Sequence, residues 1–259
     1  YISGLMQTEQ YREYLDAVTM KLTEQENAIQ GPHVEAGFMP KRAGFLVLYC
    51  EAAEEMSADT GIYDLAASLS ELPACEQKKY KAAKNQFRFR TRELNWWERT
   101  FGAWVAGKVV GANLDQNGKF ARRTEFVFER GPTVVHHPRT GIPCIQPWPF
   151  TNNTAMAVHR AAIDTFHDRH FADMDSTASS GDSVWNLVDD LGTQLGWSEP
   201  EMMGLFKSIF KTTYAHRWEV GDVLLVDNIR CGHGRMEGPK TRRSLLQLQC
   251  NYVDITTMR

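Results

Sequence analysis

The sequence lacks any long apolar stretch, because none of its hydrophobic runs approaches the roughly 20 residues that a membrane-spanning helix needs. It also lacks an excess of one charge. Its 29 basic and 32 acidic residues give a formal net charge of −3, which argues against nucleic acid or an anionic membrane as the main partner. Internal repeats and Gly/Ser-rich linkers are missing too, so we expect a single domain over residues 1–259.

Cysteine is scarce and shows no CxxC pair. The five cysteines form an odd set, which predicts reduced thiols and a cytoplasmic protein rather than a disulfide framework. Hydrophobic residues make up 42% and charged residues 24%, an ordinary globular composition that excludes a disordered chain. The first residue is a tyrosine rather than a methionine, so we expect a trimmed N-terminus.

Strand-like segments dominate the two ends of the chain, and helical patterns lie between them. This arrangement predicts an α+β protein built on a β-sandwich or barrel. Helices are expected at Tyr11–Ala28, Gly61–Leu72 (with Thr60 or Asp64 near its start), Asn153–Asp173, Ser183–Gly196 and Pro200–Tyr214. Strands are expected at Gly44–Ala53, at Gln86–Leu94, twice within Thr124–Pro147, at Asp222–Asn228 and at Ser244–Val253, with a turn at Asp115–Lys119.

One pair of residues narrows the choice among the eight histidines. In "GPHVEAGF", His33 and Glu35 stand two positions apart, and on an extended segment such side chains point to the same face. A third ligand from a distant strand would complete a set of two histidines and one carboxylate. Such a set suits Fe(II) and leaves three neighbouring coordination positions open. His233, expected in a turn about 200 residues later, is the candidate third ligand.

Two arginines, Arg242 and Arg243, follow His233 at the start of an expected strand. Because side chains alternate along a strand, one guanidinium can face inward, where it is costly unless it meets an anion. Its planar fork matches a carboxylate. A dicarboxylate that binds the metal at one end would present its far carboxylate to this arginine. A solvated histidine and a pair of solvated strand arginines are the simpler alternatives.

The segment "WEVGDVLLVDNIRCGHGR" (Trp218–Arg235), followed by the two arginines, resembles the C-terminal signature of the taurine dioxygenase family of Fe(II)- and 2-oxoglutarate-dependent oxygenases. Four shorter pieces match in the family's order: "HVEAGF" resembles the first metal-ligand segment, "DTGIYD" (Asp59–Asp64) the "ETxxxD" segment, "HPRTG" the "HPxTG" turn, and "SGDS" the "GDG" segment ahead of a helix. Glutamate stands where many members carry aspartate, as in the branch that contains clavaminate synthase.

The resemblance implies a double-stranded β-helix (jelly-roll) core with flanking and inserted helices. It implies that His33, Glu35 and His233 bind Fe(II), that Thr60 hydrogen-bonds the metal-proximal carboxylate of 2-oxoglutarate, and that Arg243 pairs with the distal carboxylate. Four further signature residues have structural roles in this interpretation. Gly221 and Asp222 are expected to set a turn, and Asp227 and Asn228 to brace the loop that aims His233.

The implied reaction uses O2 and 2-oxoglutarate to hydroxylate, desaturate or cyclise an unactivated C–H position, with release of succinate and CO2. Because Glu35 fills the position that related halogenases leave for chloride, hydroxylation is favoured over halogenation. A free or carrier-bound amino acid, or another natural-product intermediate, is the expected substrate, and a homo-oligomer is compatible with the sequence. Two alternatives stay open: a zinc-dependent hydrolase, although HExxH is missing, and a non-catalytic β-sandwich binding module.

Overall fold

The computed structural model describes residues 12–15, 19–23, 30–37, 39–54, 58–90, 93–97, 99–100, 111–112, 119–120, 123, 125–128, 131–167, 182–236 and 243–258. Its strands are β1 Arg12–Tyr14, β2 Thr19–Thr23, β3 Lys41–Ala53, β4 Thr60–Asp64, β5 Lys84–Arg90, β6 Gly111–Ala112, β7 Glu125–Val127, β8 Gly131–Pro132, β9 Val134–His136, β10 Pro143–Ile145, β11 Asp182–Val188, β12 Thr213–His216, β13 Val223–Asp227, β14 Cys231–Arg235 and β15 Arg243–Asp254. Its helices are α2 Leu65–Glu71, α3 Ala74–Ala82, α5 Asn152–Thr165, α6 Glu199–Lys211 and the short 3-10 helix η1 Ile255–Thr257.

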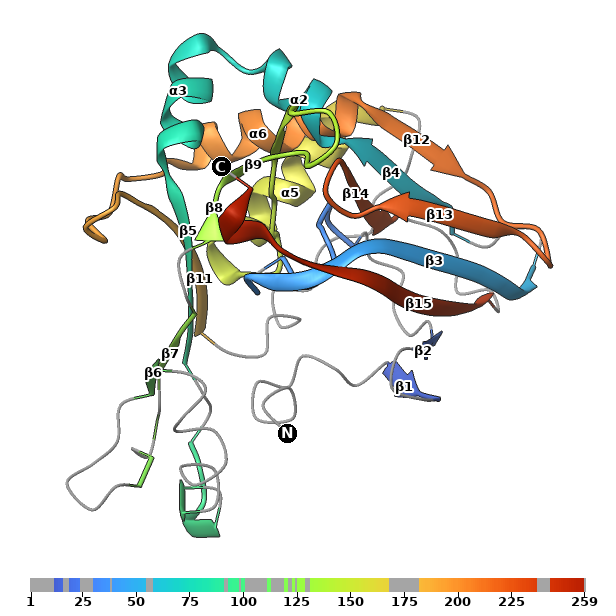
Figure 1. Cartoon of the computed structure of the whole chain (residues 1–259), viewed down its shortest axis with the longest axis horizontal. Helices are drawn as coiled ribbons and strands as arrows, with labels where there is room; N and C mark the ends of the chain where they lie inside the picture. Colours follow the sequence, from blue (N-terminus) through green and yellow to red (C-terminus); the bar gives the residue numbers. More distant parts are fainter. Residues whose placement is uncertain are drawn as a thin grey trace.

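Two antiparallel sheets face each other in one half of the molecule (Figure 1). The larger sheet has the order β1-β2-β15-β3-β13, and the smaller has the order β12-β4-β14. Leu46 of β3 and Val226 of β13 pack against Ile62 of β4, so the inner faces of the two sheets share one apolar cluster. The chain crosses from the larger to the smaller sheet at the turn 228–230, between β13 and β14.

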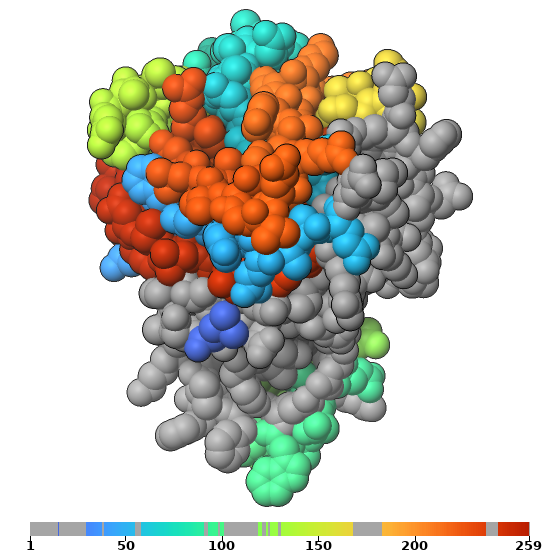
Figure 2. Space-filling model, turned by 90° about the vertical axis from the view of Figure 1, so that its right-hand side faces the viewer, coloured from blue at the N-terminus to red at the C-terminus, as the bar shows by residue number. Residues whose placement is uncertain are grey.

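Strand β3 explains why this sandwich forms. In its apolar run, Leu46, Leu48 and Cys50 are buried, whereas the intervening Tyr49 is 40% exposed. This two-residue period gives one inward and one outward face. Strand β15 pairs along nearly the whole length of β3, with a register shift between Ser244 and Leu245. Strand β3 pairs with β15 on one side and with β13 on the other. In the side view of Figure 2, the blue surface of β3 accordingly lies between the red of β15 and the orange of the β12–β13 region.

The largest apolar cluster of the described residues reaches from Tyr63 of β4 into the other half of the molecule. A further sheet, β11-β5-β7-β6 with β8 also paired to β5, extends away from the sandwich (Figure 1). Phe87 of β5 and Trp185 of β11 are buried there together with Phe206 and Ile209 of α6. Helix α6 begins in a capping box formed by Ser198 and its third residue, Glu201. No described helix combines the length and the apolar content that crossing a membrane requires.

The α+β class and most of the expected elements are confirmed, including the strand in Gly44–Ala53 and the helices within Asn153–Asp173 and Pro200–Tyr214. The "HPRTG" turn joins β9 and β10, which pair as a hairpin. Within Gly61–Leu72 the prediction was partly wrong, because residues up to Asp64 form β4. The helix begins at Leu65, where the Asp64 carboxylate accepts hydrogen bonds from the amides of Ala66 and Ala67.

Two expected helices are strands instead. Ser183–Gly196 contains β11, whose alternate residues Trp185 and Leu187 are buried against β5 and its neighbours. Pairing with β5 along the whole of β11 sets the extended conformation, and the "SGDS" resemblance to a helix start was misleading. In Tyr11–Ala28 the described residues form β1 and β2, because pairing with β15 outweighs a helix-forming composition. Residues 113–118, which hold most of the expected turn Asp115–Lys119, and residues 168–173 lie outside the described part.

Candidate metal centre

His33 and His233 are paired directly through their backbones. The amide of His33 donates to the carbonyl of His233 at 2.9 Å, and the amide of His233 donates to the carbonyl of His33 at 2.8 Å. This antiparallel bridge adds the His33 segment to the edge of β14. His233 therefore lies on a strand rather than in the predicted turn, which is confined to residues 228–230. Strand pairing brings two histidines about 200 positions apart into adjacent places, with ring centroids 4.3 Å apart.

The Glu35 carboxylate completes the group. Its Oε2 lies 3.8 Å from His233 Nε2, and the three candidate ligand atoms of His33, Glu35 and His233 all lie within 4.8 Å of one another. The three residues are 1%, 4% and 7% exposed, so the group is almost completely removed from solvent. The predicted convergence of these side chains is confirmed, although Glu35 stands in a turn rather than on an extended segment.

A hydrogen bond fixes which nitrogen of His33 can bind a metal. Its Nδ1 lies 2.9 Å from the carbonyl of Gly31. Since a carbonyl only accepts, Nδ1 carries the proton, and Nε2 keeps a lone pair. Metal-binding histidines in proteins are oriented in this way. The ring is also held by edge-to-face contacts with Phe150 at 4.6 Å and Trp148 at 6.1 Å between centroids.

The donor set fits a divalent cation. A carboxylate buried beside two imidazoles is costly unless a positive charge compensates it, and a metal ion supplies that charge. Nitrogen and oxygen donors at typical distances of about 2.1 Å suit Fe(II) or zinc. Among the residues that the structure describes, His33, Glu35 and His233 are the group found with this character.

Arg243 and Thr60 form a second polar group on the inner faces of the two sheets. Arg243 Nη1 donates to Thr60 Oγ1 at 3.3 Å and to the carbonyl of Ala58 at 2.6 Å. In the pairing of β14 with β4, His233 is opposite Ile62, two residues from Thr60. Thr60 and His233 therefore share a face as diagonal neighbours, about 7–8 Å apart in such a pair. A five-carbon diacid can span that distance.

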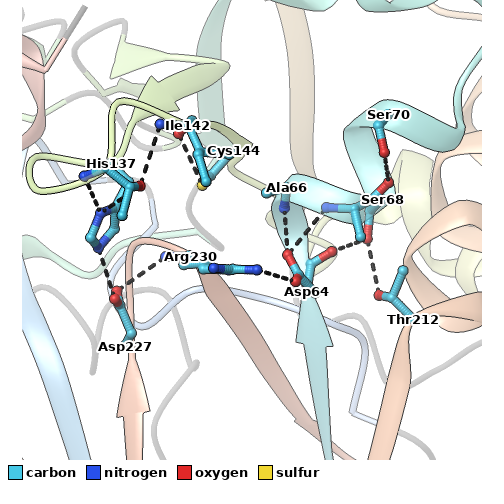
Figure 3. Close-up of polar contacts among 12 residues, drawn as sticks. Asp64, Ala66, Ser68, Ser70, His137, Ile142, Cys144, Thr212, Asp227 and Arg230 are labelled. Atoms are coloured by element: carbon cyan, nitrogen blue, oxygen red, sulfur yellow. Dashed lines mark hydrogen bonds and ion pairs between the residues drawn. The ribbon is translucent and has the colours of Figure 1, made fainter.

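A network of hydrogen bonds around Asp227 supports the turn 228–230 (Figure 3). Asp227 Oδ1 accepts from the amides of Ile229 and Arg230, and Asp227 Oδ2 lies 2.9 Å from His137 Nε2. His137 belongs to the "HPRTG" turn and accepts at Nδ1 from the amide of Thr140, so its Nε2 donates to Asp227. The Asp227 network thus holds the chain just before β14, as the sequence predicts for Asp227.

Asn228 acts at a different place from the one expected. Its Oδ1 accepts from the amide of Glu35 at 2.7 Å, and its Nδ2 donates to the carbonyls of Glu35 at 3.2 Å and Ala43 at 2.7 Å. Asn228 therefore braces the Glu35 segment rather than the His233 loop. The sequence contains no signal for this long-range contact, nor for that of His137 with Asp227. The predicted turn role of Gly221 and Asp222 is confirmed, because Asp222 Oδ2 accepts from the amide of Glu219 and Gly221 has a φ of +96°.

The buried group of two histidines and one carboxylate beside two antiparallel sheets is the donor set of a non-haem metal site. The family model described as "Taurine catabolism dioxygenase TauD, TfdA family" matches residues 5–249. The chain therefore belongs to this family of Fe(II)- and 2-oxoglutarate-dependent dioxygenases. This placement favours an oxygenase over the zinc hydrolase and the non-catalytic binding module.

Solved structures support the same fold. PvcB, an Fe, alpha-ketoglutarate dependent oxygenase from an isonitrile synthetic pathway, has a TM-score of 0.51 at 16% identity over 95% of this chain and 68% of that one. A Burkholderia xenovorans protein assigned to the alpha-ketoglutarate-dependent taurine dioxygenases has a TM-score of 0.52 at 13% identity over 95% of this chain and 70% of that one. A search of curated proteins found no significant match.

Proposed function

We propose that the chain hydroxylates an unactivated C–H position of a small molecule, with Fe(II) held by His33, Glu35 and His233. The single observation that carries this assignment is the approach of the three donor atoms to within 4.8 Å in a buried site. When bound, Fe(II) with 2-oxoglutarate and O2 supplies the oxidant, and succinate and CO2 are released. We also propose that the two facing sheets form a double-stranded β-helix.

Each side chain has a defined task in this proposal. The hydrogen bond of His33 Nδ1 to Gly31 keeps Nε2 directed to the metal, and Glu35 supplies a negative charge that neutralises part of the ion's charge. Burial of all three side chains excludes water from the reaction. Arg243 provides the cation for the distal carboxylate of 2-oxoglutarate. The contact of Thr60 with Arg243 supports assigning Thr60 to that distal carboxylate instead of the metal-proximal one.

The substrate class is part of the proposal. An amino acid or another natural-product intermediate, free or carrier-bound, is the assigned class, and hydroxylation is preferred to desaturation or cyclisation. The role of PvcB in an isonitrile synthetic pathway supports a biosynthetic reaction. The five cysteines are all free thiols, which supports a reducing compartment such as the cytoplasm.

Anaerobic metal and co-substrate binding tests this function. The purified protein with Fe(II) and 2-oxoglutarate should give a weak visible charge-transfer band that requires both additions. The band should disappear in His233→Ala and persist in His136→Ala, which removes an exposed histidine of β9. Absence of the band in the wild-type protein, or its persistence in His233→Ala, contradicts the assignment. A succinate-release screen over amino acids and biosynthetic intermediates then identifies the substrate.

A further inference from the structure

Trp218 lies in the loop between β12 and β13 and is only 4% exposed. Its indole packs with Leu48, Cys50 and Leu245 of the larger sheet. From there it reaches across to the smaller sheet, where Nε1 donates to Thr60 Oγ1 at 2.9 Å. The indole therefore connects the two sheets at the same hydroxyl that Arg243 contacts.

The loop holds this indole in a fixed position. The Asp222 carboxylate accepts from the amide of Glu219 at 2.9 Å and lies 3.1 Å from His216 Nε2. The two residues that Asp222 contacts flank Trp218 in the sequence. The His216 ring in turn meets the Trp218 ring edge to face, with centroids 4.5 Å apart and planes at 90°. Gly221, at a φ of +96°, allows the chain to make this turn.

The hydrogen bonds of Thr60 decide where its proton points. A hydroxyl has two lone pairs and one proton. The Thr60 oxygen accepts from Trp218 Nε1 at 2.9 Å and from Arg243 Nη1 at 3.3 Å, which occupies both lone pairs. The proton must then point away from both donors. In the part of the chain that the structure describes, no side chain accepts it, and the hydroxyl is left as a donor for a bound anion beside Arg243.

We propose that Trp218 is a positioning residue that makes the co-substrate site selective for 2-oxo acids with a second carboxylate. By filling one lone pair of Thr60, the indole N–H turns this hydroxyl into a donor directed at the distal carboxylate, next to the guanidinium of Arg243. The inference rests on the proposed function, because it assigns the distal carboxylate to the Arg243–Thr60 group. A tryptophan that only filled the core would affect all 2-oxo acids equally.

Trp218→Phe tests this role because it keeps an aromatic ring and removes the N–H. The anaerobic Fe(II) protein is titrated with 2-oxoglutarate and with 2-oxobutyrate, which lacks the distal carboxylate, and binding is followed by the charge-transfer band and by calorimetry. We expect the dissociation constant for 2-oxoglutarate to rise roughly 5- to 20-fold, as for a weakened hydrogen bond to a charged group. The constant for 2-oxobutyrate should change by less than about 2-fold.

Trp185→Phe is the matched control. Trp185 is also fully buried, and its Nε1 also donates to a side-chain oxygen, that of Asn85, but it lies in the other core. This variant should leave the ratio of the two constants unchanged. In a Thr60→Val background, Trp218→Phe should add no further loss for 2-oxoglutarate, because the hydroxyl through which it acts is gone.

The outcomes separate the two proposals. If the wild-type protein binds neither 2-oxo acid with Fe(II), the proposed function fails. If it binds both and Trp218→Phe weakens both equally or neither, only the role of Trp218 fails. Should Trp218→Phe not fold, the indole N–H resonance of Trp218 in the wild-type protein provides the test. It should shift on addition of 2-oxoglutarate and not of 2-oxobutyrate, and equal shifts overturn the inference.

Discussion

Asn228 and Glu35 are 193 positions apart, yet the side chain of one holds the backbone of the other from both sides. Asn228 Oδ1 accepts from the Glu35 amide at 2.7 Å, while Asn228 Nδ2 donates to the Glu35 carbonyl at 3.2 Å. The asparagine is completely buried, and its own amide donates to the carbonyl of Gly44 on β3. The backbone that carries the Glu35 carboxylate is thus tied to the larger sheet.

Asn228→Ala should therefore weaken metal binding. The substitution removes both bonds that hold Glu35, and loss of such supporting contacts typically lowers metal affinity about 10- to 100-fold. The measurement is calorimetric or fluorescence titration with Fe(II) or Mn(II) under anaerobic conditions. Asn153→Ala is the control, because Asn153 brackets the backbone of Trp185 in the same way, away from the site. Equal loss of metal affinity in both variants would contradict the role of Asn228.

Gly234 allows the His33 segment to approach β14. A Cβ at this position would lie 2.4 Å from the carbonyl oxygen of Gln30 and 3.1 Å from that of Gly31. Neither backbone atom can move without displacing His33, so Gly234→Ala should abolish the Fe(II)-dependent charge-transfer band. Gly131→Ala is the control, since its Cβ would meet only Ile255, at 3.5 Å. Retention of the full band in Gly234→Ala would show that this close packing is dispensable.

The sequence predicted those strands and helices whose conformation follows from their own residues. The apolar run of β3 and the helix expected at Pro200–Tyr214, which contains most of α6, could be recognised without knowing the partner elements. Strand β11 and the β1–β2 pair were wrongly expected to be helices, because their conformation depends on pairing with β5 and β15. Long-range pairing leaves little trace in the pairing segment itself.

In the candidate site, too, the sequence reveals some residues and not others. His33, Glu35, His233 and Arg243 could be named as candidates because their spacing and residue types match a known chemistry. The contacts that hold them could not be identified in this way. Asn228 to Glu35 and His137 to Asp227 join segments far apart in the chain. For Thr60, the sequence indicated a co-substrate contact, but the neighbouring Arg243 was needed to suggest which carboxylate it serves.

Thiol reactivity should distinguish the cysteines. Cys75 is exposed, whereas burial raises the pKa of Cys144 to about 12 and that of Cys231 to about 11. Because the thiolate is the reactive form, these two thiols should react slowly near neutral pH. Titration of the folded protein with a chromogenic disulfide should show a fast phase that Cys75→Ser removes. A fast phase that survives in Cys75→Ser would indicate that one of the other four cysteines is more accessible than its burial implies.

The Asp64 carboxylate should make stability depend on pH. Burial raises the pKa of Asp64, but the hydrogen bond from Arg230 at 2.8 Å and those from two helix amides outweigh this effect and lower the pKa overall. A depressed carboxyl pKa contributes stability above the unfolded value of about 4, and this contribution is lost as the pH falls through the lower folded value. Asp64→Ala, which also removes the cap of α2, should cost about 1 kcal/mol at pH 7.

Thermal unfolding of the wild-type protein, Asp64→Ala and Asp64→Asn between pH 3 and pH 7 measures this contribution. The Asp64→Ala cost corresponds to a decrease in Tm of about 3 °C at pH 7 for a domain of this size. Asp64→Asn keeps a capping oxygen but not the charge, so its difference from the wild-type protein should shrink toward pH 3. Asp164→Asn is the control, because Asp164 pairs with Lys207 and is 45% exposed, where an ion pair contributes little. A difference between the wild-type protein and Asp64→Asn that stays constant over the whole pH range would mean that the charge of Asp64 does not stabilise the link between α2 and the turn before β14.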